Sequence, residues 1–441
     1  MEKNCEQVPE GGWGYLVMVS VFIVHLTAVI PFSTFGLIFG DFMASLGNET
    51  SGTTLALSIA IACSCITGFL SSFLLKKYTY RQVGFTGACI QCLSMVLVLF
   101  AKNLFLFIIS YSIMGGLGSG LMVTAAFSSL NEYFHKKLNL IAGVAQLMIT
   151  VFTMIYPLLI AYSMKNLGFF YTKGVLVVIS FSNIFAAWAL HPVEWHIKHF
   201  EGRELLQETK STLNNCKKPL LREEGEREKI IQLSEATKPN EDINNKTSTL
   251  SLLKSPKFLN IVIGCAICFS SDNLFIGLIR LVLNDLGFNI LDIATMSMVH
   301  FACDLVSRII YVVVSALYPI KNRYVFFVGT LVTIVFRIVF VLHDNYLWRI
   351  LSLAILGFAR CCIQTPYSLV LSEEYRDDFS TALGLFMLAS GIISLILGQI
   401  TNYVKNFTNN DAMFLQVFTV AMIITAISWS IEFIYRLIKK K

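Results

Sequence analysis

Residues 15–39 read YLVMVSVFIVHLTAVIPFSTFGLIF, a run of 25 residues without a single Lys, Arg, Asp or Glu. A helix needs about 20 apolar residues to cross the roughly 30 Å hydrocarbon core of a bilayer, so this run is long enough to span it. The chain contains twelve such runs, at 15–39, 53–75, 83–100, 105–130, 140–164, 169–190, 261–283, 293–317, 325–342, 347–372, 381–404 and 413–437. They predict an all-α membrane protein with twelve transmembrane helices.

The composition of the 441-residue chain favours the same fold class. Hydrophobic residues make up 55% of it, charged residues 14%, and the mean hydropathy is +0.67. Soluble domains carry about 25% charged residues, so this chain has too little polar material for a water-facing surface. It is also too apolar to be disordered. The net charge of +6 remains because membrane helices exclude charges while loops keep basic ones, so it does not indicate a nucleic-acid partner.

The polar segment 191–260 divides the twelve runs into two sets of six. We therefore expect a cytoplasmic N-terminus at 1–14, a six-helix half at 15–190, a mostly flexible cytoplasmic linker at 191–260, a second six-helix half at 261–437 and a cytoplasmic tail at 438–441. Paired halves of this kind are common in secondary transporters.

The basic residues predict the orientation. With both ends inside, the cytoplasmic segments other than the linker carry thirteen Lys and Arg. The external segments carry five, which are Lys102, Lys165, Lys173, Arg280 and Lys405. Because cytoplasmic loops are enriched in Lys and Arg, we expect both termini in the cytosol of a multi-pass plasma-membrane protein. Glycosylation sequons at Asn48 and Asn406 fall in segments expected to be external.

One ion pair is predicted inside the membrane. Asp304 and Arg308 lie four residues apart in the eighth run, so their side chains share one helix face. Ionisable residues at this depth are costly and are therefore candidates for function. Arg308 offers a planar set of hydrogen-bond donors suited to a carboxylate. Asp304 either holds Arg308 in place or takes a proton. The alternative is a static pair that only joins two helices.

Other ionisable residues in the runs have several interpretations. Arg360 is either a second charge in a central cavity or the partner of an acidic group. Asp272 is either that acidic group or the cap of an interrupted helix. Arg337 and Glu432 are expected nearer the membrane surfaces, with their charged ends reaching water. His300 is expected to be a packed residue of the core rather than a proton relay.

The glycine spacing predicts a packing surface, and no motif in the sequence predicts an enzyme or a metal-binding protein. Gly384, Gly391 and Gly398 recur every seven residues in the eleventh run and predict a smooth packing surface. No hydrolase, kinase or metal motif is visible, and the CxxC pairs lie inside apolar runs rather than in loops. We therefore expect no enzymatic activity, cofactor, metal site or disulfide framework.

Three features resemble the monocarboxylate transporter family. Glu10-Gly11-Gly12-Trp13-Gly14-Tyr15, directly before the first run, is similar to the signature that opens its members. The stretch from Tyr133 to Gly143 is similar to its second signature, and Asp304 and Arg308 match its Asp/Arg pair in the eighth span. The resemblance covers the layout of the whole chain and implies a major facilitator fold.

The resemblance also implies functions for individual residues. In the family, the Arg receives the carboxylate of the substrate and the Asp participates in proton coupling, roles that fall on Arg308 and Asp304. Conformational or signature roles fall on Glu10, Gly11, Trp13, Lys136, Lys137 and Gly143. The expected partners are a small organic anion, membrane lipid and a single-span accessory glycoprotein, with no nucleic acid.

One departure from the family pattern leaves the substrate open. Lactate-carrying members have a Lys after a Pro in the first span, whereas Pro31 is followed here by Phe32. Other branches lack this Lys and move larger or neutral solutes, including aromatic amino acids, without a proton. Phe32 would suit such a ligand.

We therefore expect a plasma-membrane transporter or facilitator of small monocarboxylates or related organic solutes that works by alternating access. Arg308, Arg360 and Phe32 are expected to bind the substrate, and Asp304 is expected to couple a proton. The alternatives are a proton-independent carrier of larger or neutral solutes and a non-transporting sensor with a carrier fold.

Overall fold

The computed structural model describes residues 11–47, 49–134, 138–193, 195, 254–318, 321–343, 345–375, 379–407 and 413–439. Every regular element in these residues is a helix. Twelve of the helical stretches are long and apolar enough to cross a membrane, which confirms the predicted fold class. Glu10, Lys136, Lys137, Asn48 and most of the expected linker lie outside the described residues.

The first six spans come from the following segments, in chain order. They are α1 (Trp13–Val24) with the π-helical turn His25–Val29 and α2 (Ile30–Ser33); α4 (Glu49–Leu74); α5 (Tyr80–Phe100); α6 (Leu104–Phe107) with the π-helical turn Ile108–Met114 and α7 (Gly115–Tyr133); α8 (Leu138–Leu167); and α9 (Phe169–Ser180) with α10 (Ser182–Ala189). The shorter α3 (Phe35–Ser45) follows the first span.

The last six spans follow residue 254. They are α14 (Pro256–Asp285), α15 (Ile290–Leu317), α16 (Asn322–Leu342), α17 (Tyr346–Gln364) with α18 (Pro366–Glu374), α19 (Phe379–Phe407) and α20 (Gln416–Lys439), which a 3-10 turn at Met413–Leu415 precedes.

Polar residues define where several spans begin. Lipid offers no water to backbone N–H and C=O groups, so each span bonds them internally as a helix, and only the ends need other partners. Asn103, Asn289 and Asn345 accept hydrogen bonds from first-turn amides of α6, α15 and α17 at 2.8–3.1 Å. These side-chain caps satisfy donors that the helix itself leaves free.

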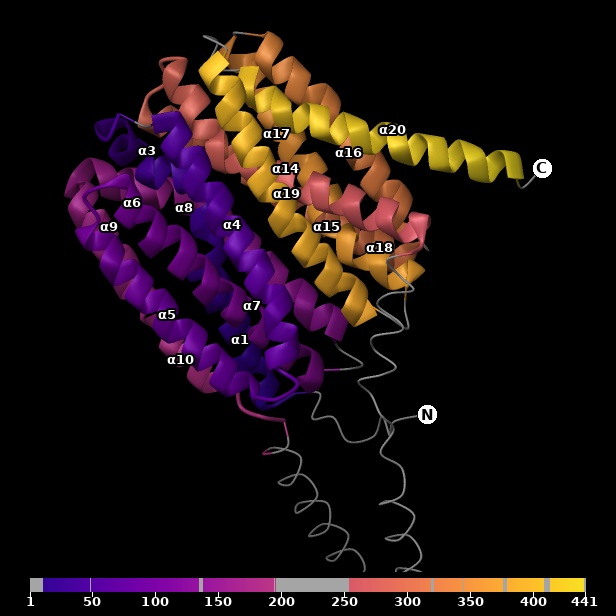
Figure 1. Cartoon of the computed structure of the whole chain (residues 1–441), viewed down its shortest axis with the longest axis horizontal. Coiled ribbons are helices and arrows are strands. Elements are labelled where there is room, and N and C mark those ends of the chain that lie inside the picture. Colours follow the sequence, from indigo (N-terminus) through magenta and orange to yellow (C-terminus); the bar gives the residue numbers. More distant parts are fainter. Residues whose placement is uncertain are drawn as a thin grey trace, which may run out of the picture.

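The spans before and after residues 196–253 form two bundles that lie side by side (Figure 1). We call α1 to α10 the first bundle and α14 to α20 the second bundle. Between them, α4 lies against α19, α8 lies against α15, and α14 touches α2, α3 and α4. Residues on these helices therefore control how closely the two bundles approach.

The α4–α19 contact uses the predicted glycine surface. A Cβ atom on Gly391 would lie 2.9 Å from Ile66 Cγ1 and 3.1 Å from the carbonyl oxygen of Ala62. A Cβ atom on Gly384 would lie 3.1 Å from the ring of Phe69. These positions have little or no room for a side chain, so glycine is what lets the two backbones come together.

The first span is interrupted, a feature that its continuous apolar run did not indicate. The π-helical turn His25–Val29 precedes α2, and Thr34 then breaks the helix with φ and ψ of −111° and 14°. Pro31 contributes to the interruption because it has no N–H with which to continue the helical bonding. The fourth span contains a second π-helical turn, Ile108–Met114. Such turns are frequent at functional sites.

Candidate functional site

The structure brings Asp304 and Arg308 together in the interior of α15. Arg308 Nε donates to Asp304 Oδ2 at 3.1 Å, and Arg308 Nη1 donates to Thr365 Oγ1 at 3.3 Å. The side chains of Asp304 and Arg308 are 4% and 14% exposed. The pair is therefore buried, and it contacts the junction between α17 and α18.

Two polar atoms of this pair have no partner in the part of the chain that the structure describes. Asp304 Oδ1 is buried without a hydrogen bond, and no described group accepts a bond from Arg308 Nη2. A buried polar atom left unpaired costs about 1–3 kcal/mol. Asp304 Oδ1 and Arg308 Nη2 are therefore each able to form a further hydrogen bond.

A second set of buried charges surrounds Asp272 on α14. Arg337 Nη2 lies 3.3 Å from Asp272 Oδ1, and Arg360 Nε lies 3.6 Å from Asp272 Oδ2. Gln364 donates to Asp272 Oδ2 at 2.9 Å, and Arg360 Nη2 donates to Asn273 Oδ1 at 3.4 Å. Because α14 is continuous here, Asp272 is the acidic partner of Arg360 and not the cap of an interrupted helix.

The prediction that the charged end of Arg337 reaches water at a membrane surface was wrong. Its side chain is 1% exposed, and its guanidinium carbon lies 4.2 Å from the centre of the Phe275 ring. The sequence did not indicate this because the carboxylate that holds it, Asp272, is 65 residues away on another helix. Glu432 also accepts a bond inside the protein, from Arg323 Nη2 at 2.6 Å, and does not simply extend into water.

Two residues assigned to external segments lie within spans and are buried. Lys173 donates to the carbonyl oxygen of Leu99 at 3.2 Å and lies 4.7 Å from the centre of the Phe169 ring, so it stabilises the end of α5. Arg280 belongs to α14, and its Nη2 donates to Asp41 Oδ1 at 2.8 Å. Arg280 therefore links the second bundle to α3 of the first.

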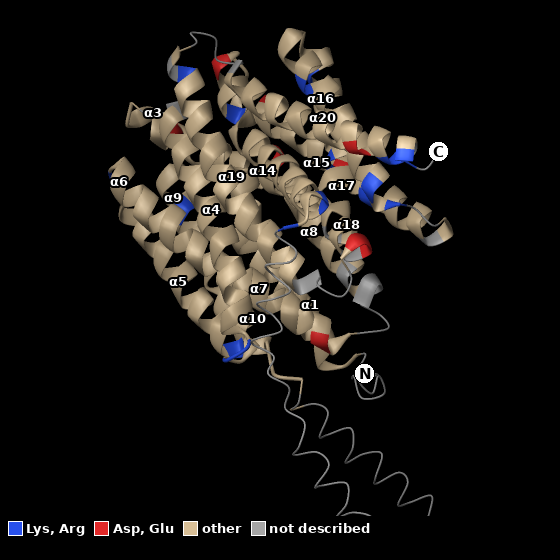
Figure 2. Ribbon diagram, turned by 45° about the vertical axis from the view of Figure 1, so that its right-hand side comes forward, with Lys and Arg blue, Asp and Glu red and all other residues tan. Residues whose placement is uncertain are grey.

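The buried charges are concentrated in the second bundle. Among the described residues of the first bundle, Lys173 is the only buried Lys, Arg, Asp or Glu. The second bundle buries Asp272, Arg280, Asp304, Arg323, Arg337 and Arg349. Figure 2 shows long tan stretches, which contain no Lys, Arg, Asp or Glu, along α4, α5 and α7. The two bundles therefore present chemically different material to a solute between them.

Phe32 lies where the two bundles meet. It is half-buried in α2, and its ring is 6.4 Å from the ring of Tyr111, edge to face. A Cβ atom on Gly277 of α14 would lie 3.1 Å from the Phe32 carbonyl oxygen. Gly277 follows Asp272 by five residues, about 7.5 Å along the helix. Phe32 therefore contacts α14 about two turns or less beyond Asp272, on the side of α14 that faces the first bundle.

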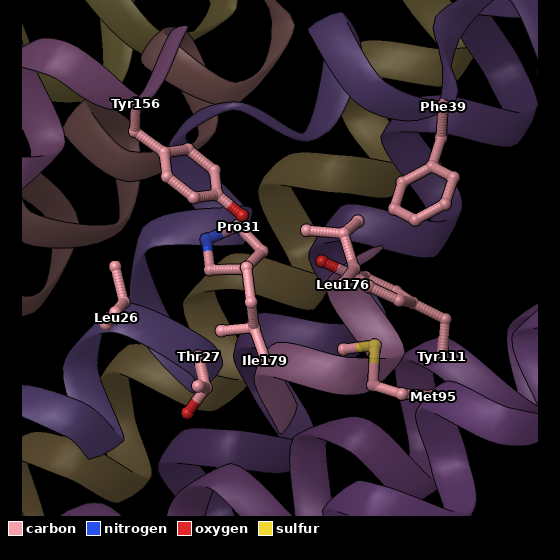
Figure 3. Close-up of a pocket in the computed structure, with 9 residues that line it drawn as sticks. All are labelled: Leu26, Thr27, Pro31, Phe39, Met95, Tyr111, Tyr156, Leu176 and Ile179. Atoms are coloured by element: carbon pink, nitrogen blue, oxygen red, sulfur yellow. The ribbon is translucent and has the colours of Figure 1, made fainter. Parts of the chain in front are cut away.

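A small cavity lies inside the first bundle beside both π-helical turns (Figure 3). Its volume is about 10 Å³, space for about one water molecule. The lining residues are Leu26, Thr27, Pro31, Phe39, Met95, Tyr111, Tyr156, Leu176 and Ile179. In this conformation the cavity is too small for an organic solute. The charged residues of the second bundle therefore remain the stronger candidates for a binding site.

The two signature stretches meet at one end of the first bundle. Trp13 Nε1 donates to the carbonyl oxygen of Ala189 at 2.8 Å, and the Trp13 ring stacks on His191 at 4.4 Å. The Tyr15 ring lies 5.8 Å from that of Phe134, which belongs to the second signature. This contact joins the start of the first span to the ends of the fourth and sixth.

Two further signature glycines lie in the described residues. The carbonyl oxygen of Gly11 accepts a bond from Gly14 N at 3.2 Å in the turn that opens α1. Gly143 lies in α8, where an added Cβ atom would meet nothing within 4 Å. Neither residue touches the charged site, so their contacts give them a local role in the backbone.

The chain is similar to curated monocarboxylate transporters over part of its length. It is 27% identical to monocarboxylate transporter 13 of Rattus norvegicus over 39% of this chain and 40% of the relative. It is 28% identical to monocarboxylate transporter 7 of Homo sapiens, over 32% of this chain and 27% of the relative. The matched region therefore spans two fifths or less of these relatives.

Solved structures share the fold across almost the whole chain. The crystal structure of a POT family transporter in complex with 5-aminolevulinic acid has a TM-score of 0.66 and covers 96% of this chain and 97% of its own, at 13% identity. The model of the Major Facilitator Superfamily matches residues 21–398. That match covers most of the chain, and together with the twelve spans it shows that the protein is a multi-pass membrane transporter belonging to the Major Facilitator Superfamily.

Proposed function

We propose that the protein is a plasma-membrane secondary transporter of small monocarboxylates or related organic solutes. Both termini lie in the cytosol, and the two bundles alternate in exposing one central site to either side of the membrane. The similarity to monocarboxylate transporters 7 and 13 supports a small organic anion as the substrate.

The observation that carries this proposal is the incomplete bonding of the Asp304–Arg308 pair. Arg308 is held by Asp304 and Thr365 but keeps one guanidinium nitrogen without an acceptor in the described chain. A guanidinium group binds a carboxylate in a planar, two-point geometry. A substrate carboxylate at Arg308 competes with Asp304 for the guanidinium group. The released Asp304 is then able to take a proton.

The contact between the bundles supports alternating access. Arg280 of α14 donates to the Gly36 and Leu37 carbonyl oxygens of α3 as well as to Asp41. Figure 1 shows α3 and α10, which precedes the expected cytoplasmic linker, at opposite ends of the first bundle. We assign the α3 end to the outside, so the contact closes the outer entrance and must break for the site to open outward.

The test is uptake of labelled carboxylates by cells that lack other carriers. Arg308→Gln should reduce uptake about 30-fold or more, because removing the charged donor that receives the carboxylate costs about 2–5 kcal/mol of binding free energy. Delivery to the cell surface should be retained. Arg436→Gln is the matched control, because Arg436 pairs with Glu432 but is 41% exposed. Normal uptake by Arg308→Gln would remove Arg308 from the mechanism.

A proton-independent carrier of larger or neutral solutes is the second candidate. It is favoured by the absence of Lys and Arg from residues 15–39 and by the Tyr111 ring beside Phe32. Uptake of carboxylates and aromatic amino acids at two external pH values distinguishes the candidates. Proton coupling requires faster carboxylate uptake at the lower pH, and Asp304→Asn should remove that dependence.

A further inference from the structure

The hydroxyl group of Tyr111 is buried in the first bundle without a partner. Tyr111 belongs to the π-helical turn Ile108–Met114 and is 2% exposed, and its hydroxyl oxygen forms no hydrogen bond with any described residue. Its ring is fixed by the rings of Phe35, Phe39 and Phe107, whose centres lie 5.1–5.3 Å away. Because a buried tyrosine hydroxyl normally has a partner, this unpaired group requires an explanation.

Tyr156 of α8 supplies a second hydroxyl group to the same cavity. It is 5% exposed, and no hydrogen bond joins its hydroxyl to another residue that the structure describes. Figure 3 shows the two phenol groups entering from opposite sides, with their hydroxyl ends toward the middle of the cavity, near Pro31 and Leu176. Two spans that are distant in sequence therefore present two unpaired hydroxyl groups to one space.

The size and lining of the cavity limit what is able to occupy it. Its volume of about 10 Å³ is the least that accommodates one water molecule. None of the described residues that line it is charged, so an ion there would have no opposite charge to balance it. An apolar occupant would leave both hydroxyl groups unpaired. Water is the ligand that satisfies size, charge and hydrogen bonding together.

We propose that this cavity is the binding site of one ordered water molecule, which bridges the hydroxyl groups of Tyr111 and Tyr156. A phenol is both a donor and an acceptor, so the water molecule accepts from one hydroxyl and donates to the other. The bridge pairs the Tyr111 hydroxyl and joins the fourth span to α8. This inference goes beyond the proposed function and does not depend on it.

The water site lies behind the helices through which the first bundle touches the second. Pro31, which lines the cavity, belongs to α2, and α2 contacts α14. Tyr156 belongs to α8, which lies against α15. A bond through water is nearly as favourable in enthalpy as a direct bond, and its geometry is easier to adjust. The bridge therefore keeps the two hydroxyl groups paired when α2 and α8 shift against each other.

The test is a double-mutant cycle on the purified full-length protein. Tyr111→Phe and Tyr156→Phe should each lower the midpoint of thermal unfolding by about 1–2 °C. The double variant should lower it by no more than the larger single change, because loss of either hydroxyl releases the same water molecule. Tyr162→Phe is the matched control on α8 and should leave the midpoint unchanged, because the Tyr162 side chain is 69% exposed. A density map that resolves ordered water should show a peak between the Tyr111 and Tyr156 oxygens.

Three results would overturn the inference. An unchanged or higher midpoint in Tyr111→Phe would show that its hydroxyl has no partner, because removal of an unpaired buried group is neutral or stabilising. Additive losses in the double variant would show that the two hydroxyl groups bond to separate partners. A map in which the two oxygens bond directly, with no density between them, would exclude a bridging water. Uptake by the wild type tests the transport function separately from all three.

Discussion

Replacing Arg280 with methionine should open the outer end of the molecule. The Arg280 side chain is 7% exposed, and it donates to the Gly36 and Leu37 carbonyl oxygens and to Asp41. A hydrogen bond from a charged donor contributes about 1.5–3 kcal/mol. The carbonyl oxygens already accept bonds within α3, so we take about 2–4 kcal/mol for both together. The Asp41 side chain is 61% exposed, so this ion pair adds no more than about 1 kcal/mol.

Together these contacts amount to about 2–5 kcal/mol, which corresponds to a population shift of roughly 30- to 4,000-fold toward the outward-open state. The assay is labelling of Leu57→Cys by a membrane-impermeant maleimide from outside. Leu57 is fully buried, and its side chain contacts the position where a Cβ atom would lie on Gly277. The same chain without the added cysteine measures the background from the native cysteines.

Arg280→Met should therefore accelerate the labelling of Leu57→Cys strongly. Asp41→Asn is the matched control and should change the rate about fivefold or less, because it removes only the solvent-exposed partner. Equal labelling rates with and without Arg280→Met would refute the assignment of this contact as the outer closure. A larger effect of Asp41→Asn than of Arg280→Met would show that the carbonyl bonds contribute little.

Two further predictions concern stability. Gly391→Leu should lower the free energy of unfolding by about 1–3 kcal/mol, because its side chain would overlap Ile66 and the Ala62 backbone. Gly143→Ala should instead raise it by about 0.5–1 kcal/mol, because the added methyl group meets nothing and alanine favours the helix. Thermal unfolding of the purified proteins measures both, and a loss of stability in both variants would contradict the packing argument. Trp13→Phe should lower the free energy of unfolding by about 1 kcal/mol, because it removes the hydrogen bond to the Ala189 carbonyl oxygen. Trp188→Phe should lower it by less, because that side chain is 44% exposed. Equal losses of stability in the two variants would show that the Trp13 bond is unimportant.

Hydrophobicity alone was sufficient to predict the fold class. Each apolar run of bilayer length had to become a helix because lipid satisfies no backbone group, and neighbouring runs are separated by polar residues such as Asn103 and Asn289. The interruption of the first span at Thr34 was not predicted, because a π-helical turn leaves the hydrophobic pattern unchanged.

The site was predictable only where its partners are close in sequence. Asp304 and Arg308 are one helical turn apart, so their spacing was enough to predict the pair. Arg337 depends on Asp272, which another helix brings to it, and no local pattern records that meeting. The sequence therefore placed Arg337 at a membrane surface, whereas the packing of α14 against its neighbours buries it.

The unequal distribution of buried charge has a consequence for how a carrier of this kind moves. In the proposed mechanism, a solute bound by Arg308 is held by the second bundle. The first bundle, whose buried charge is limited to Lys173 among the described residues, offers such a solute no buried ionic partner that has to be released when the bundle moves, apart from that lysine. Movement of the first bundle is resisted by side-chain packing and by the Arg280 contact with α3, so the residues that set the speed of transport differ from those that set the affinity for the solute.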